Sequence, residues 1–133
     1  MKYVAYIGAK TNNDGSQPAS DLKEGVIYSV IRENEGDSRT NLELEGLPVD
    51  KRLSLPGYNS EWFKPAYKAK SFYKPVVGKW LHDFTRESEY GWEAIEHSSR
   101  VLKVKYLWKK RFYIVETINS VYFVKRSIIP VVH

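Results

Sequence analysis

The clearest pattern of hydrophobic and polar positions lies between residues 100 and 126. Three runs there are rich in Val, Ile, Tyr, Phe and Trp, and they are separated by Lys109-Lys110 and Ile118-Asn119. β-Branched and aromatic side chains fit the pleated, half-buried surface of a strand. The pattern therefore predicts a three-stranded antiparallel meander.

A register for this meander follows if each connection is a two-residue loop. The first loop then pairs Leu102 with Thr117, Val104 with Val115 and Tyr106 with Tyr113, and the second pairs Val115 with Tyr122 and Tyr113 with Val124. Because strand side chains alternate between faces, one face of the sheet gathers an apolar set that is expected to form the core. Its members are Leu102, Val104, Tyr106, Trp108, Tyr113, Val115, Tyr122 and Val124.

Residues 1–72 contain short alternating segments interrupted by turn residues. Strands are expected at 2–7, 25–31, 41–45, 52–55 and 67–72. A loop rich in Asn, Asp, Gly, Ser and Pro spans residues 11–20, and residues 58–63 resemble one helical turn. Five short strands, a long first loop and a single turn before the last strand make the order of an SH3-like barrel.

The segment between these regions, residues 74–99, permits two interpretations. The positions that fall on one face of a helix are Val77, Trp80, Leu81 and Phe84. Trp80, His82 and Phe84 also alternate, as they would in a strand. We favour a helix within 76–86, which would cover the second face of the meander, where lysines mix with Phe112, Ile114 and Phe123.

Together these patterns predict a mainly β protein. An SH3-like small barrel is expected at 1–72, and a short helix or linker followed by an antiparallel β-meander module is expected at 73–133. No apolar run approaches the ~20 residues that span a bilayer, and the N-terminal MKYVAYIGAK has no signal-peptide hydrophobic segment. We therefore expect a cytoplasmic protein.

The first half carries a recognisable motif. It consists of two stretches, Leu22-Lys23-Glu24-Gly25-x-x-Tyr28-x-Val30 and Tyr58-x-x-x-Trp62-Phe63-x-Pro65. Together they resemble small SH3-like modules common in bacteriophage and prophage proteins. Such modules typically read Lys-Gly-x-x-Tyr-x-Val and end with an aromatic-Phe pair. The resemblance covers about residues 1–66.

A second motif covers about residues 91–126. It consists of Trp92, Ser99-Arg100-Val101 and Glu116-Thr117-x-Asn119-Ser120-x-Tyr122. This pattern is similar to another small β-rich phage-type module of uncharacterised function. That module usually has Thr-Ser where this chain has Ser98-Ser99, and its hairpin is usually less basic. Neither resemblance supplies catalytic residues. Together they imply an accessory factor that acts on a bacterial host protein, in the host cytoplasm.

Charge is distributed unevenly along the chain. The net charge is +5, yet residues 1–72 carry ten Lys/Arg and ten Asp/Glu, so the whole excess lies in residues 73–133. Between residues 100 and 126 there are eight basic residues and one acidic residue. A local excess of this kind indicates a binding surface for an anionic partner more strongly than the overall charge does.

The candidate binding residues are the cations of this region: Arg100, Lys103, Lys105, Lys109, Lys110 and Arg111. Aromatic residues lie between them, and nucleic-acid binding uses cations for phosphates and flat rings for bases. The predicted register opposes that use, because it places Tyr106, Trp108 and Tyr113 in the core. An acidic protein surface is therefore the preferred partner. Nucleic acid and a merely solvated hairpin remain the alternatives.

Other chemistry is weakly represented. The absence of cysteine excludes disulfides and thiolate metal sites. His82 and His97 have neighbouring carboxylates but not the two-histidine spacing of a metal site on a helix, and no nucleophile elbow or phosphate-binding glycine loop is present. We expect no metal or cofactor. Tyr58 and Trp62 are candidates for an aromatic peptide groove, although such a pair more commonly closes the bottom of a barrel.

These inferences predict a non-enzymatic, phage-type binding protein that inhibits or redirects a host protein, as an anti-defence factor would. The alternative is a nucleic-acid-binding protein that uses the basic hairpin at 100–111. A small enzyme is the third and least favoured class.

Overall fold

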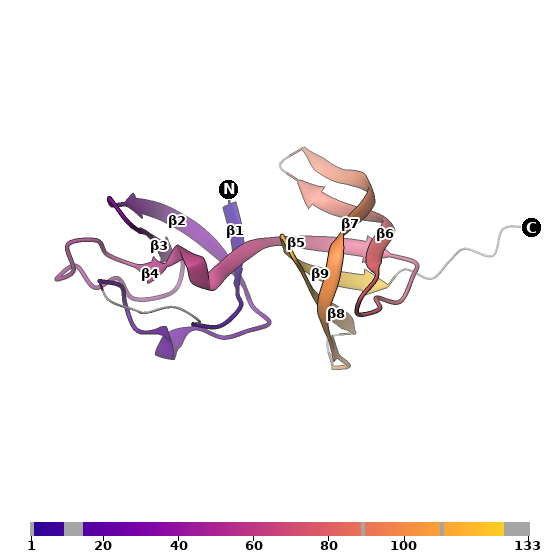
Figure 1. Ribbon diagram of the computed structural model, residues 1–133, viewed down its shortest axis with the longest axis horizontal. Helices are drawn as coiled ribbons and strands as arrows, with labels where there is room; N and C mark the ends of the chain where they lie inside the picture. The colour runs from indigo at the N-terminus through magenta and orange to yellow at the C-terminus, as the bar shows by residue number, and fades with distance from the viewer. Residues whose placement is uncertain (1, 10–14, 89, 110, 127–133) are drawn as a thin grey trace, which may run out of the picture. The chain divides into compact units, whose positions relative to one another are not determined.

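The computed structural model describes residues 2–9, 15–88, 90–109 and 111–126 (Figure 1). Over these residues the chain is mainly β, as predicted, with nine strands, two short 3-10 turns and no α-helix. Its contacts divide it into two compact units, Met1–Pro65 and Ala66–His133. This boundary comes earlier than the expected one at residue 72, because residues 66–71 pair with strands of the second unit.

The first unit is an antiparallel sheet in the order β4-β3-β2-β1-β5. Its strands are β1 (Lys2–Tyr6), β2 (Ile27–Glu35), β3 (Thr40–Leu44), β4 (Tyr58–Asn59) and the first residues of β5 (Phe63–Ser71). Its turns are η1 (Ala19–Asp21) and η2 (Ser60–Trp62). η2 confirms the single helical turn predicted before the last strand.

The strand predicted at 52–55 is wrong, since residues 45–57 form turns and bends. Side chains bond the backbone there in place of a strand partner. Gln17 Oε1 accepts hydrogen bonds from the amides of Asp50 (3.0 Å) and Gly57 (3.1 Å). The buried Asn41 donates from Nδ2 to the carbonyl of Leu55 at 2.7 Å. Backbone groups satisfied in this way need no sheet partner.

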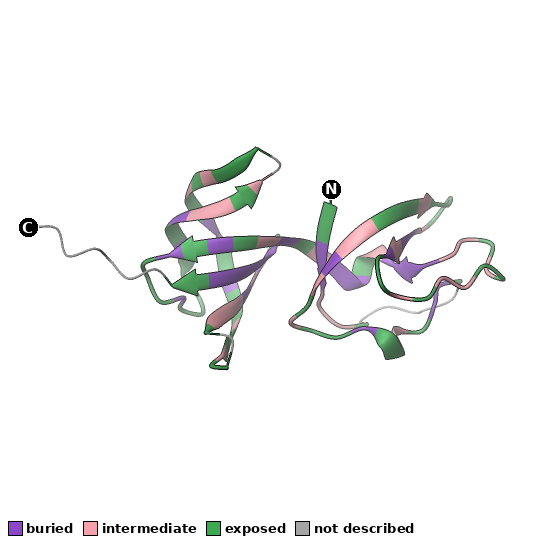
Figure 2. Ribbon diagram, turned by 180° about the vertical axis from the view of Figure 1, so that it is seen from behind, coloured by how far each residue is buried: buried purple, intermediate pink, exposed green. Residues whose placement is uncertain are grey.

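The core of the first unit lies between its strands and η2 (Figure 2). It consists of Val4, Leu22, Tyr28, Leu42, Leu44, Tyr58, Trp62 and Phe63. Tyr28 also fixes the long first connection, because its hydroxyl accepts a hydrogen bond from the Lys23 amide at 2.9 Å. The Lys and Tyr of the first motif are thus joined directly.

The second unit is a ring of five hydrogen-bonded strands. The later part of β5 is followed by β6 (Trp80–Ser88), β7 (Gly91–Leu107), β8 (Phe112–Thr117) and β9 (Val121–Arg126). Successive strands are antiparallel, and β9 returns to pair in parallel with β5. The ring encloses Ala69, Leu81, Phe84, Val101, Val115, Tyr122 and Val124.

The helix predicted within 76–86 is wrong, because residues 76–79 form a loop and turn and residues 80–86 belong to strand β6, as in the strand interpretation. Leu81 and Phe84 are both buried and lie three residues apart, which imitates helical spacing. The cause is Asp83, whose positive φ of 50° interrupts the alternation of the strand. Asp is among the few residues that adopt this conformation readily. Val77 and Trp80, the other members of the supposed helical face, are exposed.

The predicted register of the meander is confirmed over most of its length. The pairs that agree are Val104–Val115, Tyr106–Tyr113, Val115–Tyr122 and Tyr113–Val124. It is wrong at the start of the hairpin, where a bulge between Val101 and Lys103 makes Val101, not Leu102, the partner of Thr117. Val101 is consequently buried, whereas Leu102 is 44% exposed.

The turn between β8 and β9 is built by residues of the second motif. The amide and the hydroxyl of Thr117 donate to the Ser120 carbonyl at 2.8 and 3.1 Å, and the Ser120 amide donates back to Thr117 Oγ1 at 3.1 Å. The Asn119 amide donates to Ser99 Oγ at 3.1 Å. These motif residues therefore hold the turn against β7.

Candidate functional site

Five of the six predicted cations lie within the described residues, all of them on the β7–β8 hairpin and all exposed. They are Arg100, Lys103 and Lys105 on β7, and Lys109 and Arg111 in the connection to β8. Lys110 lies outside the described residues. Lys103 stands opposite Glu116, whereas Lys105 stands opposite the apolar Ile114.

Two aromatic residues that were predicted to be buried are exposed on the same hairpin. Tyr106 is 48% exposed and Trp108 is 70% exposed. The prediction failed because alternation assigns side chains to a face but does not say which of them the core covers. Val115 is buried and Val104 and Tyr113 pack against the core, whereas Tyr106 and Trp108 on the same face are exposed.

The exposed rings are associated with neighbouring groups that orient them. The ring of Tyr106 lies 4.6 Å from that of Tyr113, at an interplanar angle of 39°. The ammonium of Lys109 lies 5.6 Å from the centre of the Trp108 ring, within the range of a cation–π contact. The tip of the hairpin thus presents flat apolar surface next to positive charge.

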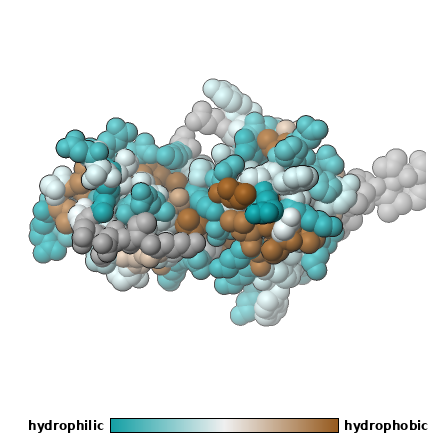
Figure 3. Space-filling view, in the orientation of Figure 1, coloured by the Kyte–Doolittle hydropathy of each residue, from teal (hydrophilic) through white to brown (hydrophobic). Residues whose placement is uncertain are grey.

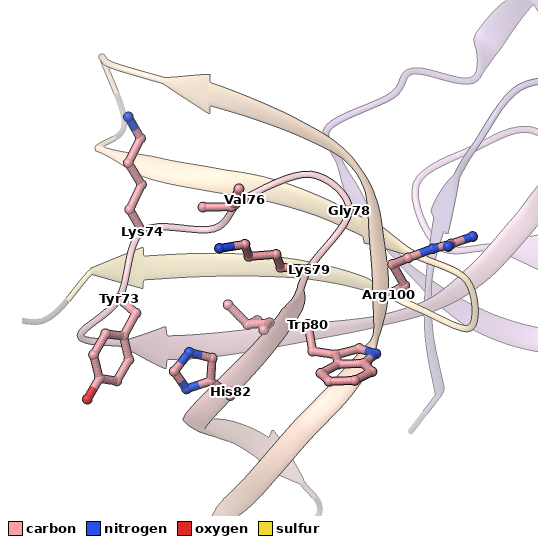
Figure 4. Close-up of a pocket in the computed structure, with 9 residues that line it drawn as sticks. Tyr73, Lys74, Val76, Gly78, Lys79, Trp80, His82 and Arg100 are labelled. Atoms are coloured by element: carbon pink, nitrogen blue, oxygen red, sulfur yellow. The ribbon is translucent and has the colours of Figure 1, made fainter.

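Arg100 lies away from the tip, where β7 pairs with β6. It is the register partner of Trp80, which is 63% exposed. Both residues line a pocket of about 490 Å³ together with Tyr73, Lys74, Val76, Gly78, Lys79, Leu81 and His82 (Figure 4). None of these lining residues is acidic. Arg100 therefore joins the predicted cations to a second group of cations and rings.

Three residues of this pocket were not predicted as binding residues from the sequence. They are Tyr73, Lys79 and Trp80. Trp80 was assigned to the apolar face of a helix that does not form. The alternation of Trp80, His82 and Phe84 was the signal for a strand. In the structure Trp80 and His82 are exposed, whereas Phe84 is buried. Pairing between Trp80 and Arg100, twenty residues apart, has no local signature in the sequence.

Not every cation of the second unit is open. Arg86 donates from Nε to Glu93 at 2.6 Å, and its guanidinium lies 4.3 Å from the centre of the Tyr67 ring. Lys70 lies 4.4 Å from the centre of the Trp92 ring. Arg86 is engaged within the unit, and we exclude it from the candidate surface.

Tyr58 and Trp62 do not form an aromatic groove. Their exposed fractions are 1% and 0%, and both belong to the core of the first unit. Burial raises the pKa of the Tyr58 hydroxyl, with smaller contributions from the charge of Asp21 and from Tyr28. Both rings are core side chains of the first unit and do not line a groove.

The histidines are dispersed. His82 Nδ1 lies 3.2 Å from Asp83 Oδ2, and His97 Nδ1 lies 3.2 Å from the carbonyl oxygen of Ser98. Within the described residues no group of three or more His, Cys, Asp or Glu side chains is arranged to hold a metal ion. Nor does any described helix have the length and apolarity to span a membrane.

Hydrophobic and hydrophilic side chains intermingle on the visible face of the second unit (Figure 3). No protein-family model, curated protein or solved structure matches the chain.

Proposed function

We propose that the second unit binds single-stranded nucleic acid without catalysing a reaction. The site is the basic–aromatic surface of the β7–β8 hairpin, defined by Arg100, Lys105, Lys109, Arg111, Tyr106 and Trp108. The observation that carries the proposal is the exposure of Tyr106 and Trp108 on the hairpin that carries these cations, with the Lys109 ammonium 5.6 Å from the centre of the Trp108 ring. Rings in this position are open to stack on bases while the cations meet phosphates.

Single strands suit this surface better than duplexes do. The faces of bases are hidden inside a duplex, so exposed Trp and Tyr rings gain little there beyond contact with the backbone. In a single strand each base offers a face, and stacking contributes about 1–3 kcal/mol per base. Because every base has such a face, binding is expected to tolerate many sequences.

An acidic protein surface is the second candidate partner. It would use the same exposed cations, and it agrees with the phage-type resemblance, which implies a factor that inhibits or redirects a host protein. The resemblance alone supports that role. Salt bridges to a protein would not require Tyr106 and Trp108 to be exposed, and for this reason nucleic acid is preferred.

Fluorescence anisotropy with labelled oligonucleotides tests the proposal. We would titrate the full chain into dT15, rU15 and a 15-base-pair duplex at several salt concentrations. Single strands should bind more tightly than the duplex. With four phosphate contacts, the logarithm of the association constant should fall with the logarithm of salt concentration with a slope of about −3.

A substitution at Trp108 distinguishes base stacking from purely electrostatic attraction between the cations and the phosphates. A Trp108→Ala protein keeps every cation, so it should retain the slope while losing affinity for single strands at all salt concentrations. Failure of both single strands to bind at low salt would refute the proposal. If the chain instead binds an acidic protein, and Trp108→Ala does not weaken that binding, an acidic protein surface is favoured as the partner.

A further inference from the structure

We propose that the pocket beside Arg100 holds one nucleotide of the bound strand, with its base on Trp80 and its phosphate on Lys79. This inference depends on the proposed function and adds a defined subsite to it. The pocket lies where β6 meets β7 and the loop before β6 passes over them (Figure 4). Its volume of about 490 Å³ lies within the range of about 300–1,000 Å³ that small-molecule sites occupy.

The charge of the pocket suits a phosphate. Three cations line it, Lys74, Lys79 and Arg100, and no carboxylate is among the lining residues. The nearest acidic residue in sequence, Asp83, is engaged with His82 at 3.2 Å. An anion placed here therefore gains attraction from the lysines without close repulsion from a carboxylate.

The rings of the pocket are supported on their inner sides. The Trp80 ring lies 5.9 Å from the His97 ring at 40°, and the Tyr73 ring lies 4.8 Å from the His82 ring at 33°. Trp80 is nevertheless 63% exposed, so much of its surface is free to accept a base. A ring that is already oriented loses less side-chain entropy when a ligand binds.

The backbone beneath Lys79 is fixed to β7 by reciprocal hydrogen bonds. The Gly78 amide donates to the Val101 carbonyl at 2.9 Å, and the Val101 amide donates to the Lys79 carbonyl at 2.8 Å. Gly78 has a positive φ of 89°, a conformation that favours glycine. These bonds hold Lys79 and Trp80 in place next to Arg100.

The direction of the Arg100 side chain links the pocket to the hairpin. In Figure 4 the side chain of Lys79 extends toward the side of Tyr73, whereas Arg100 extends away from it, beyond Trp80. Lys79 is thus placed for the phosphate of the nucleotide in the pocket. Arg100 is placed for a neighbouring phosphate of a strand that continues along β7 toward Lys105.

Nuclear magnetic resonance of the ¹⁵N-labelled full chain tests the subsite directly. The protein would be titrated with AMP, and separately with adenosine and with inorganic phosphate. AMP should shift the amide signals of Gly78, Lys79 and Val101 and the indole signal of Trp80. Adenosine and phosphate should each bind far more weakly, because each supplies only one of the two contacts.

Two variants decide whether both contacts exist. Trp80→Ala should weaken AMP binding by about fivefold or more, and Trp80→Phe should restore most of it because a phenyl ring still stacks. Lys79→Glu should abolish binding through repulsion of the phosphate. Since Lys79 is exposed, this variant is expected to fold even if Trp80→Ala does not.

The outcomes separate this inference from the function on which it rests. Oligonucleotide binding without any response to AMP at the pocket amides would overturn the subsite and leave the hairpin surface intact. AMP binding without oligonucleotide binding would refute the proposed function and retain a nucleotide pocket. Equal responses to AMP and inorganic phosphate would mean an adventitious ion only, and would overturn the assignment of the base to Trp80.

Discussion

The two units place their tryptophan side chains in opposite environments. In the first unit, Trp62 is 0% exposed and packs in the core beside Tyr58, which is 1% exposed. In the second unit, Trp80 and Trp108 are 63% and 70% exposed, and the rings of its core are Phe84 and Tyr122. Tryptophan thus belongs to the core in one unit and to the surface in the other.

Charge follows the same division. Residues 1–65 carry eight basic and ten acidic residues, a net of −2, and residues 66–133 carry thirteen and six, a net of +7. In the second unit the ring of strands encloses mostly aliphatic side chains, so its largest rings are not needed for the core. An exposed ring is costly in water, and its coincidence with positive charge points to a polyanionic ligand that has flat groups.

The largest expected effect on stability concerns Val115 and Leu102. The sequence predicted both on the core face of the meander, but only Val115 is buried in the structure. Val115 is 0% exposed and Leu102 is 44% exposed. Val115→Asp should unfold the second unit, because a buried carboxylate there has no partner. Leu102→Asp should cost less than about 1 kcal/mol. Urea denaturation followed by circular dichroism measures both, and an unchanged transition in Val115→Asp would disprove this register.

A reciprocal pair of substitutions tests the contrast between the aromatic residues. Trp62→Ala should lower the free energy of unfolding by about 3–5 kcal/mol, since it leaves a cavity in the first core. Trp108→Ala should change it by less than about 0.5 kcal/mol. Thermal unfolding should therefore show the larger loss of stability in Trp62→Ala. Oligonucleotide titration should show the larger loss of affinity in Trp108→Ala. Comparable loss of stability in the two variants would show that Trp108 has a structural role.

Charge reversal tests whether the cations of the β7–β8 hairpin bind polyanions more strongly than exposed lysines of the first unit do. Lys105→Glu/Lys109→Glu changes the net charge by −4, from +5 to +1. It should leave folding nearly unchanged, because exposed charges contribute at most about 1 kcal/mol, yet it should weaken polyanion binding by an order of magnitude or more.

The matched control for this reversal is Lys23→Glu/Lys51→Glu. Both residues are exposed in the first unit, and the change of net charge is the same. The control should bind far more tightly than the hairpin variant. Equal losses of affinity in anisotropy measurements would mean that overall charge, and not the hairpin, attracts the ligand.

The smallest effect is a pH dependence of the first unit. Burial raises the pKa of Tyr58 in the folded state above its unfolded value. The neutral hydroxyl is thus favoured on folding, so stability is fully present below a pH of about 10 and declines as pH rises further. Tyr58→Phe should show a shallower decline above a pH of about 10 in denaturant titrations. An identical decline in both proteins would contradict the assignment.

Several features were determined by the sequence itself. Alternation within the last three strands was sufficient to pair Tyr106 with Tyr113 and Val115 with Tyr122, because a period of two leaves one apolar face. Turn chemistry located η2 before the last strand of the first unit. The clustering of Arg100, Lys105 and Lys109 was likewise visible without coordinates. These are local properties of the chain.

Exposure was decided by the tertiary structure. Periodicity states which side chains share a face, but not which of them the core covers, so it placed Tyr106 and Trp108 in the core although both are exposed. The apparent helix within 76–86 arose because Asp83 takes a positive φ between two buried residues. The pocket required Trp80 to pair with Arg100. Such contacts depend on strand pairing between distant segments, and short-range patterns carry little information about them.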